Sequence, residues 1–465
     1  MKLGLSKKDE KFREFSLNGN MFRVILYVCI PLALYQSLTQ VFKVFDTMMA
    51  AHISATAVSS VAYISQIQLM LAALGSGLAV GASIKVSEAF GAGDYELVSR
   101  RVSTMIAMCA LFGGAILVIL LPASKAFLRF MKTPEEFIDI GTTYFRIEIL
   151  ALVVTFFNNI YIAIERARGN SKKILWLNMG IVVTKLSFTA VFVYILHWGV
   201  TAIAVATLIA QLSVLFIAMY SLLKKDNVFS FSMGMVSFKK EITMPMLKLS
   251  FPVMIEKAAF AVGKVIVNAM CTLYGPQTVG ALGVSNNIGG ITTMPQAGFQ
   301  EGGSAVISQN RGAKKFDRTM KAFWCVLICN LIIGVVLMTT SILCIEYISK
   351  FFAGKDVAFQ EMIKDIYRYE AWGAIPLGVN ASVLALMYGF GRTRVTLFMN
   401  FCRIFLFRVP VLMGLQKFTD FGRESAGIVM GVSNMLSGLL ALVLGITTIL
   451  SIKKNLAKEV QEENK

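Results

Sequence analysis

The chain consists of long apolar runs separated by short polar segments. Most runs span about 20 residues or more, the length that an α-helix needs to cross the hydrocarbon core of a bilayer. The pattern predicts about twelve transmembrane helices, near residues 22–50, 57–84, 102–123, 138–163, 173–196, 200–223, 245–273, 278–305, 321–346, 362–389, 394–416 and 425–451.

Composition supports this interpretation. Hydrophobic residues make up 56% of the 465 residues and charged residues only 15%, whereas soluble domains average about 25% charged residues. Residues 1–20 are polar and mostly charged, and the apolar run after them is longer than the core of a cleavable signal peptide. We therefore expect an all-α integral membrane protein whose first apolar run is a membrane span.

Residue types that build metal centres and active sites are scarce. The seven cysteines lie in apolar segments, and there are only two histidines. This distribution predicts neither a zinc site nor a disulfide scaffold. The chain also lacks the GxxxxGK[ST] pattern of phosphate-binding loops. We expect no cofactor, no metal and no enzymatic activity.

The net charge of +18 has a topological explanation. Lysine and arginine concentrate in alternate connections, together with the two ends of the chain, while the intervening connections carry few of them. The positive-inside rule places the basic set, including both termini, in the cytoplasm. An even number of spans agrees, so we expect a multi-pass plasma-membrane protein and no nucleic-acid partner.

The sequence contains an internal repeat. Residues of one type recur 221 positions apart over about sixty residues, and 222 positions apart further on. The matching pairs are Pro31 and Pro252, Gly77 and Gly298, Gly81 and Gly302, Ser87 and Ser308, Gly91 and Gly312, Asn158 and Asn380, Gly169 and Gly391, and Asn178 and Asn400. The register predicts a duplication, with six spans in each half and therefore the same orientation for both halves.

This duplication divides the chain into five parts. They are a cytoplasmic N-terminal segment (1–21), an N-terminal six-helix lobe (22–223), a cytoplasmic linker (224–244), a C-terminal six-helix lobe (245–451) and a cytoplasmic tail (452–465). Parallel repeats of this kind are common in transporters that bind substrate between their halves.

Two charges lie within the first span. Lys43 and Asp46 are three residues apart and therefore share one face of a helix. A charge in the bilayer interior costs a few kcal/mol or more, and pairing offsets this cost. The pair is either a structural ion pair or part of an ion-coupling site, and the sequence leaves both open.

Several motifs resemble the multidrug and toxic compound extrusion (MATE) transporters over the whole chain. They are Pro31 with Asp46-Thr47 fifteen residues later, the loops FGAGD and RGAKK, and the turns RGN and GRT. The resemblance implies a two-lobed bundle that exports small molecules in exchange for H⁺ or Na⁺. It also implies that Asp46 belongs to a cation site, that Thr207 lies near it and that the first helix bends at Pro31.

The chain departs from the family pattern in its fifth span. Positions where the family usually carries Asn and Asp hold Lys185 and Thr189. Lys185 is thus a second candidate partner for Asp46, and a carboxylate facing ammonium groups is a poor Na⁺ ligand. We expect coupling to H⁺ rather than Na⁺. The acidic cluster that some members carry in the C-terminal lobe is not evident either.

Lys264 lies 221 residues after Lys43, in a helix that also contains Glu256. If both lysines face a central cavity, the cavity is cationic and suits anionic or zwitterionic cargo. Snorkelling of Lys264 to the membrane interface is the alternative.

Four polar residues form matched pairs in the repeat. Asn158 and Asn380 either line a path or hydrogen-bond between helices, and packing is the favoured interpretation. Glu148 and Glu370 each follow an arginine by two residues, and we expect them to anchor helices at the outer interface.

The sequence therefore favours a monomeric secondary exporter of small organic compounds. The alternative is a flippase or exporter of anionic lipid-linked or organic-acid substrates that uses a lysine-lined cavity.

Overall fold

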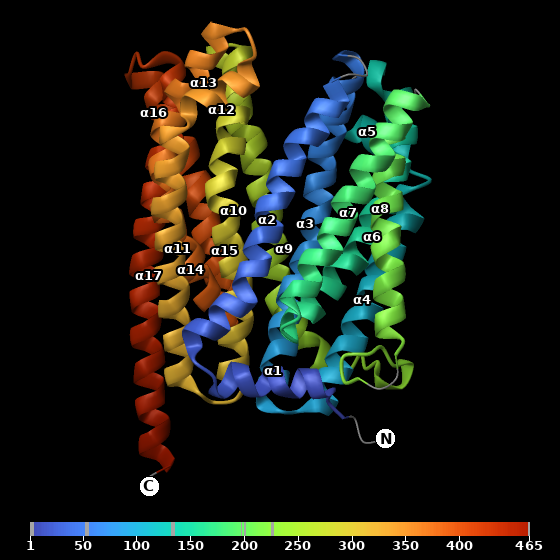
Figure 1. Cartoon of the computed structure of the whole chain (residues 1–465), viewed down its shortest axis with the longest axis vertical. Helices are drawn as coiled ribbons and strands as arrows, with labels where there is room; N and C mark the ends of the chain where they lie inside the picture. Colours follow the sequence, from blue (N-terminus) through green and yellow to red (C-terminus); the bar gives the residue numbers. More distant parts are fainter. Residues whose placement is uncertain are drawn as a thin grey trace.

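A computed structural model gives the architecture (Figure 1). It describes residues 4–51, 55–131, 135–196, 198–199, 201–224 and 227–463, but not the side chains of residues 42–51, 55–63, 65–66, 135–137, 140, 276 and 455–463. The Lys43 and Asp46 side chains therefore lie outside the described residues. Within the described part the chain is helical and contains no strand.

Helices of the first half are α1 (Lys7–Asn18), α2 (Met21–Ala51), α3 (Ala55–Ala92), α4 (Tyr95–Leu120), α5 (Ser124–Phe130), α6 (Glu135–Ala167), α7 (Ser171–Ala190), the π-helical turn η1 (Val191–Ile195), α8 (Thr201–Leu222) and η2 (Met233–Met235). Those of the second half are α9 (Lys240–Cys271), η3 (Thr272–Tyr274), α10 (Pro276–Gly312), α11 (Phe316–Leu343), α12 (Ile345–Ala353), α13 (Val357–Glu370), η4 (Ala371–Gly373), α14 (Ala374–Gly389), α15 (Thr393–Phe401), the π-helical turn η5 (Cys402–Arg408), α16 (Val409–Phe418), η6 (Gly422–Glu424) and α17 (Ser425–Glu463).

Ten helical segments of the described chain are long and apolar enough to cross a membrane. Each of the other two predicted spans also coincides with a long helix, α9 or α10. Both are more polar than the ten, because α9 carries Lys248, Glu256, Lys257 and Lys264 and α10 is rich in Asn, Gln, Ser and Thr. Several helices extend past the predicted apolar runs, and α1 lies in a segment for which the sequence pattern predicted no helix.

The two halves repeat the same packing. In the first half α2 packs on α7, α3 on α6 and α6 on α8. In the second half α9 packs on α15, α10 on α14 and α14 on α17. Across the halves, α3 packs on α9 and α10 packs on α2. The duplication seen in the sequence is therefore present in the helix contacts.

Three of the four repeated glycine pairs lie where the halves touch. A Cβ at Gly77 would come within 2.6 Å of the backbone of Met254, and one at Gly298 within 2.5 Å of the backbone of Ala33. Met254 and Ala33 are themselves 221 residues apart. The contact of Gly77 with Met254 is therefore repeated, with the two halves exchanged, as the contact of Gly298 with Ala33. A twofold pseudosymmetric interface requires such matched contacts.

A tighter contact of the same kind lies at the ends of α3 and α10. A Cβ at Gly91 would lie 1.9 Å from the carbonyl oxygen of Gln309, and one at Gly312 would lie 2.0 Å from that of Glu88. Glycine lets helix backbones approach this closely because it has no side chain. The two halves are therefore sealed together at this end.

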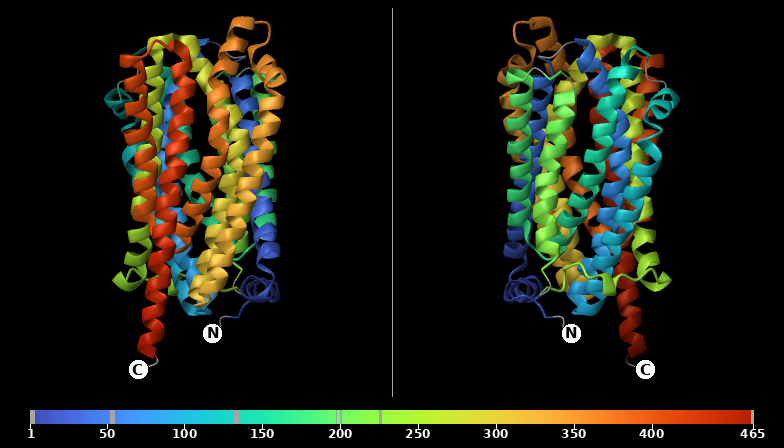
Figure 2. Two further views of the ribbon diagram at one scale, coloured as in Figure 1. Left: turned by 90° about the vertical axis from the view of Figure 1, so that its left-hand side faces the viewer. Right: turned by 90° about the vertical axis from the view of Figure 1, so that its right-hand side faces the viewer.

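Helix α1 lies across the same end of the molecule, where both termini are found (Figures 1 and 2). The Arg13 guanidinium donates to the carbonyl oxygens of Phe90 and Gly91 in the first half, each at 3.0 Å. The Ser16 hydroxyl donates to Oε1 of Gln309 in the second half at 2.6 Å. Helix α1 thus bridges the two halves.

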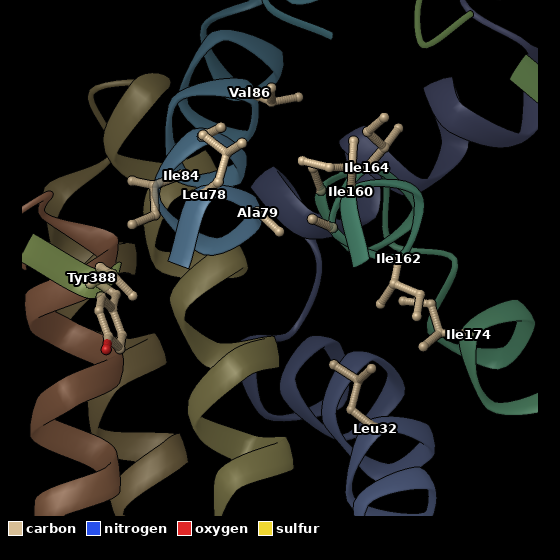
Figure 3. Packing of buried hydrophobic residues seen from close by; sticks show 14 of the residues in the cluster. Leu32, Leu78, Ala79, Ile84, Val86, Ile160, Ile162, Ile164, Ile174 and Tyr388 are labelled. Carbon is tan, nitrogen blue, oxygen red and sulfur yellow. The ribbon is translucent and has the colours of Figure 1, made fainter. Parts of the chain in front are cut away.

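A hydrophobic cluster continues through both halves. It joins Leu32 of α2 and Leu78 of α3 to Ile160 of α6 and to Tyr388 of α14 (Figure 3). The core therefore does not stop at the boundary between the halves, and it supports the glycine contacts from within.

We expect Gly91→Ala to loosen the sealed end, because the added methyl group would overlap the Gln309 carbonyl oxygen. Overpacking of this kind costs on the order of 1–3 kcal/mol. The apparent melting temperature of the purified protein should fall, and Gly312→Ala should behave alike. Gly114→Ala is the control, because no atom lies within 4 Å of a Cβ there. Equal melting temperatures of Gly91→Ala and Gly114→Ala would contradict this packing.

Candidate functional site

A cavity of about 620 Å³ lies between the halves, a size typical of small-molecule sites. Most of its lining comes from the second half, with Gln40, Leu69 and Ser76 among the contributions of the first half. Among the described side chains, the charged lining groups are Glu256, Lys257, Lys264, Glu370, Arg403 and Arg408. This described lining thus combines four basic and two acidic groups in an otherwise largely apolar and amide-rich wall.

Glu256 of α9 is the most completely hydrogen-bonded of these groups. It is 6% exposed and accepts from the Tyr388 hydroxyl at 2.7 Å, the Thr396 hydroxyl at 2.6 Å and the Asn400 amide at 2.8 Å. These donors come from α14 and α15. The network holds a carboxylate in the protein interior and ties three helices of the second half together.

Glu370 corrects one expectation from the sequence. It was expected to anchor α13 at the outer interface, but it is 8% exposed and lines the cavity. The Ser285 hydroxyl of α10 donates to it. The Arg368–Glu370 spacing suggested a position at the membrane interface. The sequence alone does not show which helices surround Glu370, so its burial in the cavity wall could not be predicted. Its repeat partner Glu148 is also buried and accepts from the Gln68 amide.

Two arginines of the cavity were not identified from the sequence. Arg403 and Arg408 lie five residues apart in η5, where i→i+5 hydrogen bonds replace the α-helical pattern. In an α-helix, residues five apart point about 140° away from each other. Here both guanidinium groups reach Oδ1 of Asn434, at 3.0 Å and 3.2 Å. The π-helical turn therefore brings them to one place.

Lys264 also reaches this region. Its Nζ lies 5.1 Å from the ring centroid of Phe260, and the guanidinium carbon of Arg403 lies 5.5 Å from the same centroid. Both contacts are within the range of cation–π attraction. Lys264 lines the cavity, which agrees with a cavity-facing lysine and not with one that snorkels to the membrane interface.

The cation site predicted in the first half is partly described. Lys185 is half-buried on α7, and Thr189 is fully buried, with no hydrogen-bond partner for its hydroxyl among the described residues. The Thr207 hydroxyl donates to the Ile203 carbonyl oxygen at 2.9 Å. Because α2 packs on α7, the backbones that carry Asp46 and Lys185 belong to neighbouring helices. Their pairing stays a prediction.

The structure separates the two asparagine candidates. Asn380 lines the cavity. Asn158 is buried and donates to Oε1 of Gln211 at 2.7 Å, so it links α6 to α8 and is absent from the described lining.

Pro31 lies inside α2 and is buried. Among the described residues, no group of histidine, cysteine and carboxylate side chains is suited to a metal ion.

We expect Glu256→Leu to destabilise the second half, because three buried donors would lose their acceptor. Each donor left unpaired costs about 1–3 kcal/mol. The melting temperature of the purified Glu256→Leu protein should fall by a large amount. The melting temperature of Glu256→Gln should fall less, because glutamine keeps an acceptor oxygen. Glu241→Leu, at an exposed position of the same helix, is the matched control. Equal effects at both positions would refute the role assigned to the network.

Comparison with known proteins agrees with this architecture. The MatE family model matches residues 31–191 and again residues 252–413, so the two matches begin 221 residues apart, at the offset of the internal repeat. The "Probable multidrug resistance protein YoeA" of Bacillus subtilis (strain 168) is 23% identical over 451 residues, which cover 95% of this chain and 96% of that protein.

Solved structures show the same fold. A MATE protein in complex with MaL6 superposes with a TM-score of 0.91 at 18% identity, covering 97% of this chain and 100% of the other. An outward-facing multidrug resistance MATE family transporter of the MOP superfamily gives 0.90 at 18% identity, with the same coverage. Because the family model covers well over half of the sequence and the fold is shared along its length, this chain belongs to the MatE family of membrane transporters.

Proposed function

We propose that this protein is a monomeric secondary exporter that moves small organic compounds across a plasma membrane by alternating access. The observation that carries the proposal is a cavity between two pseudosymmetric halves that are sealed together at one end. Rocking of two such halves about a central site exchanges access between the two sides. The names of relatives agree, since YoeA and MepA of Staphylococcus haemolyticus are a probable multidrug resistance protein and a multidrug export protein.

The orientation follows from charge. Basic connections and both termini lie on one side by the positive-inside rule, and both termini lie at the sealed end of the structure (Figure 2). In this proposal the sealed end faces the cytoplasm, so Gly91 and Gly312 belong to the cytoplasmic gate. Helix α1 would then stabilise the state that is closed to the cytoplasm.

Energy for export would come from an H⁺ gradient. In this proposal Asp46 of α2 is the coupling carboxylate, Lys43 and Lys185 are its cationic neighbours, and Thr189 and Thr207 lie near it. Lysine ammonium groups take the electrostatic place of a bound Na⁺, and protonation of Asp46 changes the balance of the pair. In the alternative role, Asp46 and its lysine neighbours form a purely structural ion pair that fixes α2 and α7. In that case substitution of Asp46 should not affect coupling.

A second candidate function concerns the cargo. The lining of the cavity by Lys257, Lys264, Arg403 and Arg408 favours an anionic substrate, which includes organic acids and anionic lipid-linked molecules. Loss of a lipid-linked intermediate from the outer leaflet in cells that lack the protein would favour a flippase. Unchanged lipid distribution, with altered efflux of soluble compounds, would favour an exporter.

We expect Asp46→Asn to abolish gradient-driven efflux, because the amide cannot exchange a proton. Purified protein in proteoliposomes, loaded with fluorescent cations and anions, measures this directly under an imposed pH gradient. Asp46→Glu is the control, since it keeps a titratable carboxylate. Wild-type efflux rates for Asp46→Asn would exclude Asp46 as the coupling residue.

A Na⁺ gradient imposed at constant pH should drive little transport in the same vesicles. A steep rise of the transport rate with Na⁺ would contradict the argument that the lysines prevent Na⁺ from binding near Asp46. The two gradients should be imposed separately, with the membrane potential clamped, so that each ion is tested alone.

A further inference from the structure

The charges of the cavity are unevenly distributed. Glu256 is satisfied by three neutral donors and lies close to Lys257. Glu370 is the other acidic lining group among the described side chains, and Arg403 and Arg408 line the same cavity. Within the described lining, one carboxylate thus accompanies two guanidinium groups. Excess positive charge in a region of low dielectric constant is costly unless an anion joins it.

The two arginines are oriented for binding. Asn434 accepts from both guanidinium groups, and the Ser433 hydroxyl accepts from Nε of Arg408 at 3.1 Å. Nε of Arg403, by contrast, is buried and has no hydrogen-bond partner among the described residues. Arg403 therefore lines the cavity in a fixed orientation, with a guanidinium whose hydrogen-bonding capacity the described residues do not fill. A guanidinium with free donors is suited to carboxylate and phosphate groups.

The arginine pair is not a requirement of the duplicated fold. At the 222-residue offset, the equivalents of Arg403 and Arg408 are Ile181 and Leu186. Both equivalents lie on α7, outside the π-helical turn η1. The first half therefore carries apolar side chains at these two positions, and the second half carries two charges there whose desolvation the fold does not demand. This asymmetry points to a ligand.

The neighbouring wall indicates what the rest of the ligand is like. Phe260 receives Lys264 and Arg403 at 5.1 Å and 5.5 Å from its ring centroid, and Leu69, Leu377 and Leu384 also line the cavity. An acidic group held by Arg403 and Lys264 would leave an apolar body against these side chains. The volume of about 620 Å³ accommodates such a molecule.

We propose that Arg403, Arg408 and Lys264 form a recognition site for amphiphilic organic anions that carry a carboxylate or phosphate group. The site deepens the proposed function, since it names the substrate class of the same cavity. Arg403 contacts the acidic group, and Arg408 with Asn434 positions Arg403. Glu370 keeps the guanidinium groups together when the site is empty.

Binding can be tested separately from transport. The full-length protein is placed in nanodiscs of phosphatidylcholine, and the fluorescence anisotropy of 5-carboxyfluorescein, an anion, is compared with that of ethidium, a cation. Wild-type protein should bind the anion more tightly. Arg403→Gln should weaken anion binding about tenfold or more, because a charged hydrogen bond is lost. The affinity of Arg403→Lys for carboxyfluorescein should lie between those of the wild type and Arg403→Gln, because lysine keeps the charge but not the planar guanidinium group.

Arg394→Gln is the matched control, because Arg394 is exposed on α15 and outside the cavity lining. Melting curves accompany each variant, and Lys264→Gln serves as a second cavity variant if Arg403→Gln does not fold. Tighter binding of ethidium than of carboxyfluorescein, or anion binding that Arg403→Gln and Lys264→Gln leave unchanged, would overturn the proposal. Anion binding without efflux in proteoliposomes would instead overturn the proposed export function and leave this site standing.

The source of the anion is distinguished by the lipid. With phosphatidylglycerol in the nanodiscs, a site that takes lipid phosphate should bind carboxyfluorescein more weakly in the wild type. A site that takes soluble anions should show the same affinity in both lipids. This comparison concerns only the source of the anion, and the Arg403→Gln and Lys264→Gln variants decide whether the site exists.

Discussion

The close approach of the two halves through glycine is the constraint on which the rest of the structure depends. At Gly91 and Gly312 the backbones are so near that a single methyl group would overlap a carbonyl oxygen of the other half. In a membrane the hydrophobic effect does not drive helices together, so small residues and backbone contact supply much of the attraction. These contacts close one end of the interface, and the cavity is the space that the two halves still enclose.

The cavity has a different physical basis. Its carboxylates and guanidinium groups are held in the interior by hydrogen bonds, such as those from Tyr388 and Asn400 to Glu256 and from Arg408 to Asn434. Such networks hold side chains in one arrangement, and they set the charge that a substrate meets. The glycine interface therefore determines where the cavity lies, and the second half determines most of its chemistry.

Sequence reasoning located the spans and the duplication well, but it placed individual polar residues less well. Glu370 was assigned to the outer interface from the arginine two residues before it, whereas in the structure it lines the cavity and accepts from Ser285. Glu256 was named as a cavity candidate, yet its donors come from helices more than 130 residues away. The side chains of Lys43 and Asp46 lie outside the described part, so the site predicted around them stays a prediction.

By itself the sequence determined the helical class, the membrane location of the spans, the family resemblance and the repeat, because hydrophobicity and residue spacing are local properties of a chain. The repeat predicted the duplication, and the structure then showed that three of its matched glycine pairs are contact points between the halves. Only the tertiary structure decided which polar groups meet. Arg403 and Arg408 would point apart on a regular helix, and their convergence on Asn434 depends on a π-helical turn and on α17 lying beside it. That arrangement arises from packing between distant segments, and residue spacing along one segment does not encode it.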